Sequence, residues 1–290
     1  IEQIRAKLGL DRPLPEQFLA YVADLASGEL GQSLSTGQSV AGEIAARLPA
    51  SIELTVVALV LAVAVSLPLG VAAAVRQGSW VDQLARIVTT AGVSLPVFFT
   101  GLLLTWLLYF VLGWAPSPIG RLEPSFSPPP TVTGLYLVDA LLVGDLELWR
   151  ACAGQLVMPA TTMALFVLAP ITRMTRASML SVLSADFVRT ARALGLRTPT
   201  VLVRYALRNA LLPVVTTLGM VFSFLLGSNV LVEKVFAWPG IGSFAIESLT
   251  ASDYAPVQGF VLTMGVLYVA LNLAIDLAYL LIDPRVAMQA

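Results

Sequence analysis

The chain contains no histidine, one cysteine and only two lysines among its 290 residues. Without histidine it cannot build an imidazole acid or base, a Ser-His-Asp or Cys-His nucleophilic site, or a Cys/His zinc site. The single cysteine, Cys152, excludes an intrachain disulfide, and we expect it to be a small buried packing residue. Neither Lys7 nor Lys234 stands in the G-x-x-x-x-G-K-[ST] frame of a phosphate loop. Any ATP hydrolysis must therefore occur on another polypeptide.

Charge is also scarce. Charged residues make up 12% of the chain and hydrophobic residues 57%, and the mean hydropathy is +0.84. A soluble domain usually carries about twice that charge. Apolar surface on this scale cannot be hidden inside 290 residues in water, so we expect most of the chain to lie in lipid. The net charge of −1 says nothing about partners.

Five apolar segments reach the roughly 20 residues that a helix needs to cross a bilayer. A backbone in lipid must satisfy its own hydrogen bonds, so these segments are expected to be helices. Only Asp276 interrupts the last one; we favour a structural role for it near the inner surface, with a functional role as the alternative. The five segments are Leu54–Val75, Ile87–Gly113, Ala151–Thr172, Asn209–Val232 and Tyr254–Ile282.

Prolines punctuate four of these spans. Each removes a backbone donor and favours a kink. We expect most of these kinks to serve packing, and the alternative is that some are bends where the bundle opens and closes. The prolines are Pro68, Pro96, Pro159 with Pro170, and Pro213.

Basic residues gather on one side of the predicted spans. Residues 173–208 hold seven arginines against one acid, and residues 76–86 hold two against one. The facing loops, 113–155 and 233–253, carry more acids than bases. The positive-inside rule therefore places the arginine-rich loops and the C-terminal tail in the cytoplasm. Residues 1–50 then lie outside, and an external start before five spans predicts a further helix before residue 1.

The outer parts have patterns of their own. Pro13–Ser27 reads as a short amphipathic helix. Trp114–Pro130 contains six prolines and is expected to be irregular. Gly134–Trp149 fits a helix in the outer interface. We expect these parts to cover the outer end of the bundle, and the alternative is a docking surface or lid for a partner that delivers substrate.

The segment Asp186–Pro213 carries five arginines between two predicted spans. Asp186 is expected to cap a helix, and Gly195 to end it. Thr198-Pro199 then begins a second helix. Such a basic helix–turn–helix is suited to be gripped by a soluble cytoplasmic partner, although Arg204 and Arg208 could instead bind anionic lipid headgroups. Apolar residues follow the cap at helical spacing beside two arginines: Val188, Ala191 and Leu194, with Arg189 and Arg192.

This segment resembles the EAA loop of bacterial ABC-importer permeases, whose pattern is E-A-A, three residues, Gly, nine residues, then I-x-L-P. Ala191, Gly195, the nine-residue gap and Leu207 match that pattern. Three positions depart from it, namely Arg189 for Glu, Thr190 for Ala and Arg208 for Pro.

The departures are similar to those of the peptide/nickel permease group, and specifically of its first, B-type subunit. Further blocks of this chain resemble that subunit along nearly its whole length: LGLDRPLPEQFLAYV, GELGQSLSTGQSV, RLPASIEL, VEKVFAWPGIG with Asp253 and Pro256, and the terminal DPR. That family has a further helix before the position of Ile1.

The resemblance implies an all-α integral membrane protein, a type I ABC-importer permease bundle with five transmembrane helices present and a first one missing. Residues 1–50 would be an extracytoplasmic segment and residues 51–290 the permease domain, with a cytoplasmic coupling loop at 182–208 and outer loops at 114–153 and 233–256. The chain itself would hold no cofactor, because ATP and magnesium would bind partner subunits. The expected partners are a homologous second permease, two ATP-binding subunits, an external substrate-binding protein and membrane lipid, in the inner membrane of a bacterium.

The resemblance also implies two sets of site residues. The set that couples to the ATPase is Asp186, Arg189, Ala191, Arg192, Leu194, Gly195 and Leu196. The set on the outer, binding-protein side is Glu233, Phe236, Pro239, Gly240, Gly242 and Asp253.

The expected substrates are di- or oligopeptides, with nickel chelates, glutathione or glycosides as alternatives within the same group. An ion-driven secondary transporter would need inverted repeats and polar residues at midplane, and neither is evident in the sequence. A membrane-embedded enzyme is disfavoured by the lack of histidine and of paired midplane acids.

Overall fold

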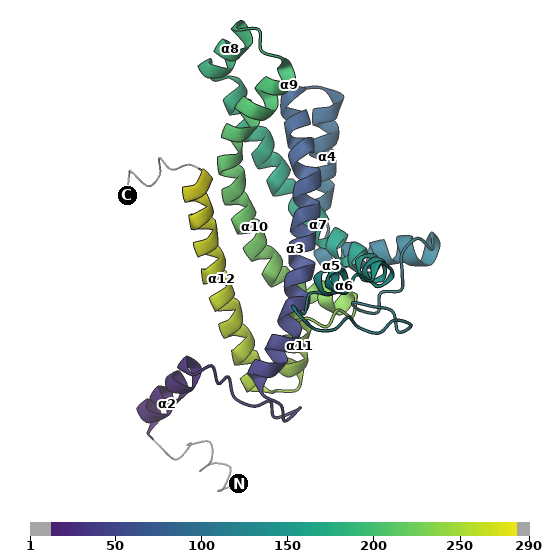
Figure 1. The fold of residues 1–290 in the computed structure, drawn as a ribbon, viewed down its shortest axis with the longest axis vertical. Coiled ribbons are helices and arrows are strands. Elements are labelled where there is room, and N and C mark those ends of the chain that lie inside the picture. The colour runs from purple at the N-terminus through teal and green to yellow at the C-terminus, as the bar shows by residue number, and fades with distance from the viewer. Residues whose placement is uncertain (1–12, 283–290) are drawn as a thin grey trace.

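Long helices set the length of the molecule and run side by side (Figure 1). The computed structural model describes residues 13–282, in which there are helices but no strand, only an isolated bridge between Gln32 and Ser39. The elements are α2 (Leu14–Ala26), α3 (Val40–Val75), α4 (Trp80–Ser94), α5 (Val97–Leu104), the π-helical η1 (Thr105–Val111), α6 (Tyr136–Val143), α7 (Leu146–Leu183), α8 (Asp186–Ala193), α9 (Thr198–Thr200), the π-helical η2 (Val201–Leu207), α10 (Arg208–Val235), α11 (Ile241–Thr250) and α12 (Tyr254–Ile282).

Four of the predicted spans lie in helices long and apolar enough to cross a membrane, which are α3, α7, the continuous run α9–η2–α10, and α12. Two of these helices are longer than the sequence indicated. α3 begins at Val40 instead of Leu54, so it passes without a break through the boundary predicted at residue 50. α7 has 38 residues and a length of about 57 Å, well beyond the roughly 30 Å of a hydrocarbon core. Both helices therefore extend into the aqueous regions.

The second predicted span is not straight. α4 ends at Ser94, and the apolar run α5–η1 continues at 103° to it. Pro96 stands at the corner, where its ring excludes a helical hydrogen bond and its neighbour Leu95 takes an extended conformation. The predicted kink is therefore present, and it is sharp enough to break the span into two helices. Counting this bent pair as one span gives five spans in the described residues, and leaving it out gives four.

The core lies where α7 packs between α3 and α10. Buried residues recur at every fourth position of α3, so one narrow stripe of that helix faces the core. Small side chains on the stripe allow close approach of the helices, and a Cβ on Gly70 would come within 2.6 Å of the Thr175 Cβ. The stripe is Ala50, Leu54, Ala58, Ala62, Ser66, Gly70 and Ala74.

The outer elements differ in part from the sequence expectation. The amphipathic helix α2 is present, but it contains no buried residue, and Leu14 and Phe18 are exposed. The predicted interface helix Gly134–Trp149 is wrong as a single helix, because Gly144 has φ +76° and separates α6 from the start of α7. The loop at 114–130 is irregular, as its prolines predicted. Cys152 is free and buried, as expected.

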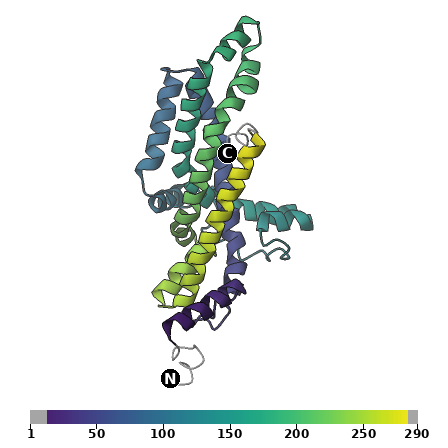
Figure 2. The ribbon, with the colours of Figure 1, turned by 90° about the vertical axis from the view of Figure 1, so that its left-hand side faces the viewer.

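The two ends of the bundle carry different loops. α8 and α9 lie at one end together with the α3–α4 turn, while α2 and α11 lie at the other (Figures 1 and 2). The arginine-rich loops thus share one end, as the charge pattern predicted. The predicted motifs at residues 8–12 and 283–285, and the side chain of Asp276, lie outside what the structure describes.

Candidate functional site

Residues 182–208, here called the arginine elbow, form a helical hairpin at the end of the bundle (Figure 1). α7 ends at Leu183, and only two residues separate it from α8. Because this connection is so short, Ala185 occupies the N-cap position and Asp186 is already the first helical residue. The predicted cap at Asp186 is therefore wrong. Its carboxylate is exposed and lies 3.5 Å from the Arg189 guanidinium, a surface pair that contributes little stability.

The end of α8 follows the prediction. Gly195 has φ +75°, a conformation that glycine adopts without steric cost. The Gly195 amide donates to the Arg192 carbonyl at 3.0 Å, and the Leu196 amide donates to the Ala191 carbonyl at 3.3 Å. α9 then begins at Thr198 with Pro199 in its first turn. The helix–turn–helix predicted from the sequence is confirmed at its turn.

One face of α8 is buried inside the elbow. Val188 and Ala191 pack against Val201 of η2, with Val182 and Leu183 of α7 around them. Ala191 is only 4% exposed, so its side chain fixes α8 to the bundle and is not available to a partner. The predicted coupling set is therefore not uniformly exposed, and Ala191 is the member that packs inside the elbow.

The opposite face of α8 and the turn are open. Leu194 is 75% exposed, and Phe187 and Leu196 are also exposed although they are apolar. Arg189 and Arg192 are exposed beside them. Apolar side chains held at the tip of a hairpin and ringed by arginines are typical of an interaction surface. The sequence prediction missed Phe187, whose position next to the predicted cap could have drawn attention to it.

The outer set of predicted residues is mostly buried. Glu233 of α10 is 0% exposed, and its carboxylate accepts hydrogen bonds from the Ser51 hydroxyl at 2.5 Å and the Ser243 amide at 2.8 Å. Ser51 accepts in turn from the Ile241 amide at 2.9 Å. Ser51, Glu233, Ile241 and Ser243, here called the outer polar cluster, therefore join α3, α10 and the start of α11.

The glycines and aromatic residues of the same stretch close around this cluster. A Cβ on Gly240 would overlap the Glu233 carboxylate, and one on Gly242 would come within 2.7 Å of Val230. Phe236 and Trp238 are buried, and the Trp238 indole donates to the Ala50 carbonyl at 2.9 Å. The packing of these residues against one another is enough to account for their presence at these positions.

Asp253 fastens a second outer loop. Its Oδ2 accepts from the Ser33 hydroxyl at 2.8 Å, and from the Ser35 amide and hydroxyl, both at 3.0 Å. Burial alone would raise the pKa of Asp253, but these hydrogen bonds outweigh it and hold that pKa below its ordinary value of 3.8. Of the six predicted outer residues, only Pro239 is exposed.

The sequence prediction missed two ion pairs whose carboxylates are buried. Arg121 of the proline-rich loop lies 2.6 Å from Glu53 of α3 and 3.5 Å from the centroid of the Tyr136 ring. Arg176 of α7 lies 2.7 Å from Asp82 of α4. The two members of each pair are far apart in sequence, by 68 residues for the first pair and 94 for the second, so no local pattern links them.

Within residues 13–282 no group of three or more Cys, Asp or Glu side chains is placed to hold a metal ion. The structure thus presents an exposed helical tip at one end of the bundle and a buried, hydrogen-bonded cluster at the other. The exposed tip is suited to binding, whereas Ser51 and Glu233 of the outer polar cluster are buried and hydrogen-bonded within the protein.

Comparison with known proteins agrees with this geometry. The sequence profile of the family described as "Binding-protein-dependent transport system inner membrane component" matches residues 66–288. The chain is 44% identical over 286 residues to the probable D,D-dipeptide transport system permease protein DdpB of Escherichia coli (strain K12), covering 99% of this chain and 84% of that protein. It is 41% identical over 283 residues to the di/tripeptide transport system permease protein DppB of Pseudomonas aeruginosa (98% and 84%), and 36% identical over 286 residues to the glutathione transport system permease protein GsiC of Escherichia coli O6:H1 (99% and 84%).

Proposed function

The chain belongs to the family of binding-protein-dependent transport system inner membrane components, and we propose that it forms half of the channel of an ATP-driven importer of small peptides. As a permease subunit it is a transport component and not an enzyme, and it resides in the inner membrane of a bacterium. The permease of such a system has no cofactor of its own and works with other components, among them a substrate-binding protein and an ATPase.

The proposed assembly contains this chain, a homologous second permease, two ATP-binding subunits that hold ATP and magnesium, and an external binding protein. α12 offers surface to such a lateral partner, since only 6% of its most apolar window is buried. Membrane lipid would cover the apolar surface that the subunits leave exposed.

The exposed tip of the arginine elbow carries the proposal that α8 docks on an ATP-binding subunit. Phe187, Leu194 and Leu196 offer apolar side chains to water, and Arg189 and Arg192 add positive charge around them. A partner cleft with an apolar floor and acidic rim would remove this surface from water and pair the arginines. Asp186, at the first turn of α8, would lie at the rim of the same contact.

The elbow is built to transmit force to the membrane helices. Val188 and Ala191 fix α8 to Val201, and η2 continues directly into α10. On its other side α8 follows α7 after two residues. Closure of the ATPase pair would therefore move α7 and α10 together, and a two-state bundle would convert that movement into alternating access. At the outer end the outer polar cluster would carry the signal of the binding protein, with Pro239 in contact with it.

The proposed substrates are di- or oligopeptides, by similarity to relatives named as dipeptide and di/tripeptide permeases. The similarity to a glutathione permease makes glutathione the second candidate. Uptake of a labelled dipeptide in cells that express the complete transporter would be measured in competition with unlabelled peptides and glutathione. Competition by dipeptides supports the first assignment, and competition by glutathione alone supports the second.

A charge substitution at the tip tests the docking role. Leu194→Asp leaves the buried face of α8 intact but places a carboxylate at the centre of the proposed contact. We expect the ATP-binding subunits to be lost on purification and ATP-dependent uptake to fall at least tenfold. Leu249→Asp, at an exposed leucine of the outer end, is the matched control for ATPase retention. Normal retention and uptake in Leu194→Asp would reject the docking proposal.

A further inference from the structure

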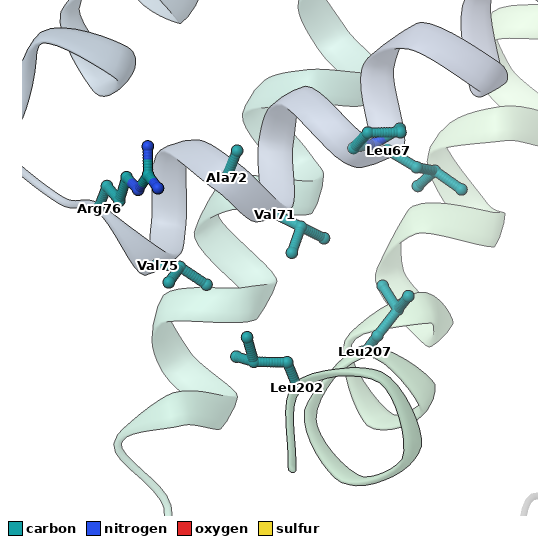
Figure 3. Close-up of a pocket in the computed structure, with 8 residues that line it drawn as sticks. Leu67, Val71, Ala72, Val75, Arg76, Leu202 and Leu207 are labelled. Carbon is teal, nitrogen blue, oxygen red and sulfur yellow. The ribbon is translucent and has the colours of Figure 1, made fainter. Parts of the chain in front are cut away.

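A groove of about 580 Å³ lies between the cytoplasmic end of α3 and η2, apart from the exposed tip of the arginine elbow and from the outer polar cluster. Leu202 and Leu207 of η2 face Val71 and Val75 of α3 across it, and Arg76 stands at one end (Figure 3). Its remaining lining is Leu67, Pro68 and Ala72, so a single charged residue accompanies an otherwise apolar wall.

A cluster of packed residues supports the walls of the groove. Val71, Leu202 and Leu207 are partly buried against a cluster of four small or flexible side chains, Ala74, Met179, Ala206 and Ala210. The π-helical turns of η2 place Leu202 and Leu207, five residues apart, on the same side. The cavity is thus preformed and apolar, as binding sites for small apolar ligands generally are.

The position of the groove fits the inner leaflet. Arg76 begins the turn after α3, in the arginine-rich loop that the positive-inside rule places in the cytoplasm. From Arg76 the apolar wall formed by Leu67–Val75 extends toward the membrane interior along about 12 Å of helix, which is the depth of the upper part of an acyl chain. Arg204 and Arg208 are exposed on the neighbouring helix. None of these three arginines forms an ion pair with a described residue.

We propose that this groove binds an anionic phospholipid of the cytoplasmic leaflet, with an acyl chain against the leucines and valines and the phosphate at Arg76. A phospholipid supplies both the apolar chain and the negative charge that the groove lacks. A partner helix laid in the groove would cover Arg76 without a counter-ion unless it brought an acid of its own. A transported peptide is disfavoured because no carboxylate lines the groove to receive its ammonium group.

The experiment uses the assembled transporter in phosphatidylcholine nanodiscs containing a minority of a photoactivatable phosphatidylglycerol. We expect crosslinks on peptides that contain residues 67–76 and 202–207. Arg76→Gln should lower the yield of phosphatidylglycerol crosslinks about fivefold, which is the effect of one basic residue at a membrane surface. The crosslinking yield of a photoactivatable phosphatidylcholine should stay unchanged. Ala72→Phe, which fills the groove, should remove both crosslinks there.

Arg150→Gln, at an exposed arginine of the outer end, is the matched control and should leave the yield unchanged. Equal yields for Arg76→Gln and the unaltered protein would overturn the proposal. So would crosslinks of the groove to a helix of another subunit, or to a photoactivatable dipeptide in place of lipid. Because the readout is lipid capture, it can fail or succeed independently of ATP-driven uptake.

Discussion

The arginine elbow and the outer set of predicted residues, here called the outer corner, were both predicted as contact sites from their resemblance to family motifs, yet the structure buries them to different extents. In the elbow, Leu194 and the neighbouring arginines point into solvent, and Ala191 alone of the predicted coupling side chains is buried. In the outer corner, five of the six predicted residues are buried, and Glu233 has no exposed surface. A recognisable motif can thus mark an exposed surface at one end of a helix bundle and a packed joint at the other.

The comparison indicates where each kind of damage would appear. Substitutions in the elbow tip should spare the fold and affect assembly, because nothing within residues 13–282 packs on it closely. Substitutions in the outer corner should affect stability first, because buried polar groups there depend on one another. The predictions below test this division, beginning with the largest expected change in stability.

Breaking the buried pair between Arg121 and Glu53 should have the largest effect. In Arg121→Met the Glu53 carboxylate stays buried without its cation, a change that typically costs about 3–5 kcal/mol. The midpoint of thermal unfolding of the purified permease should therefore fall markedly. The double variant Glu53→Gln with Arg121→Met should recover part of the loss. Arg150→Met, at an exposed arginine, should stay near the unaltered protein, and an equal loss there would contradict the assignment.

The same substitution at two glycines should give different results at the two ends. In Gly240→Ala the new methyl overlaps Glu233 and Ser51, so we expect a loss of about 1–3 kcal/mol from overpacking. In Gly195→Ala there is open space, and only the φ of +75° is unfavourable, at about 1 kcal/mol. Thermal unfolding of both variants measures the difference. A larger loss at Gly195 would reverse the proposed division between the ends.

Asp253 should give a smaller, pH-dependent effect. Its pKa is held below 3.8 in the folded state, so its stabilising contribution is complete above that value and disappears as the pH falls through the lowered pKa. Asp253→Asn should cost about 1–2 kcal/mol at neutral pH, and its difference from the unaltered protein should narrow below about pH 4. Glu247→Gln, at an exposed ion pair with Lys234, is the control and should show no such narrowing.

Asp139 has a related environment and contributes to the remaining acid sensitivity. Burial would raise its pKa, but hydrogen bonds from Thr133, Gly134 and Val132 outweigh that effect and lower it. The Asp253→Asn variant should therefore still lose stability in acid, less steeply than the unaltered protein. A pH-independent midpoint in that variant would show that Asp139 contributes nothing.

Local sequence features predicted much of this architecture. The apolar runs located four long helices, Pro96 located the corner in the second span, and Gly195 with Pro199 located the turn of the elbow. Each of these depends on residues close in sequence, where proline and glycine act directly on the backbone. The 103° angle at Pro96 was not predictable, because packing of α5 against α7 and α10 fixes it.

The burial of the outer residues could not be read from the sequence because it depends on distant partners. Ser51 lies 182 residues before Glu233, and Ser33 lies 220 residues before Asp253. An acid in the sequence is typical of a surface residue, and these distant hydroxyls, together with the Ser243 and Ser35 amides, stabilise the two carboxylates inside the protein. The capping prediction at Asp186 failed for a different reason, since the two-residue connection from α7 shifts the helix start by one position.

The smallest change in stability should accompany the largest loss of function. Phe187→Ser together with Leu194→Ser removes two exposed apolar side chains from the elbow tip, and surface substitutions of this kind usually change stability by less than about 0.5 kcal/mol. Thermal unfolding of the isolated permease should therefore be unchanged, whereas retention of the ATP-binding subunits should fall. Val188→Ser, one position along on the buried face, should instead lower the unfolding midpoint. If both variants lowered that midpoint equally, the tip would be part of the packed hairpin, and the contrast between an exposed inner contact and a buried outer joint would fail.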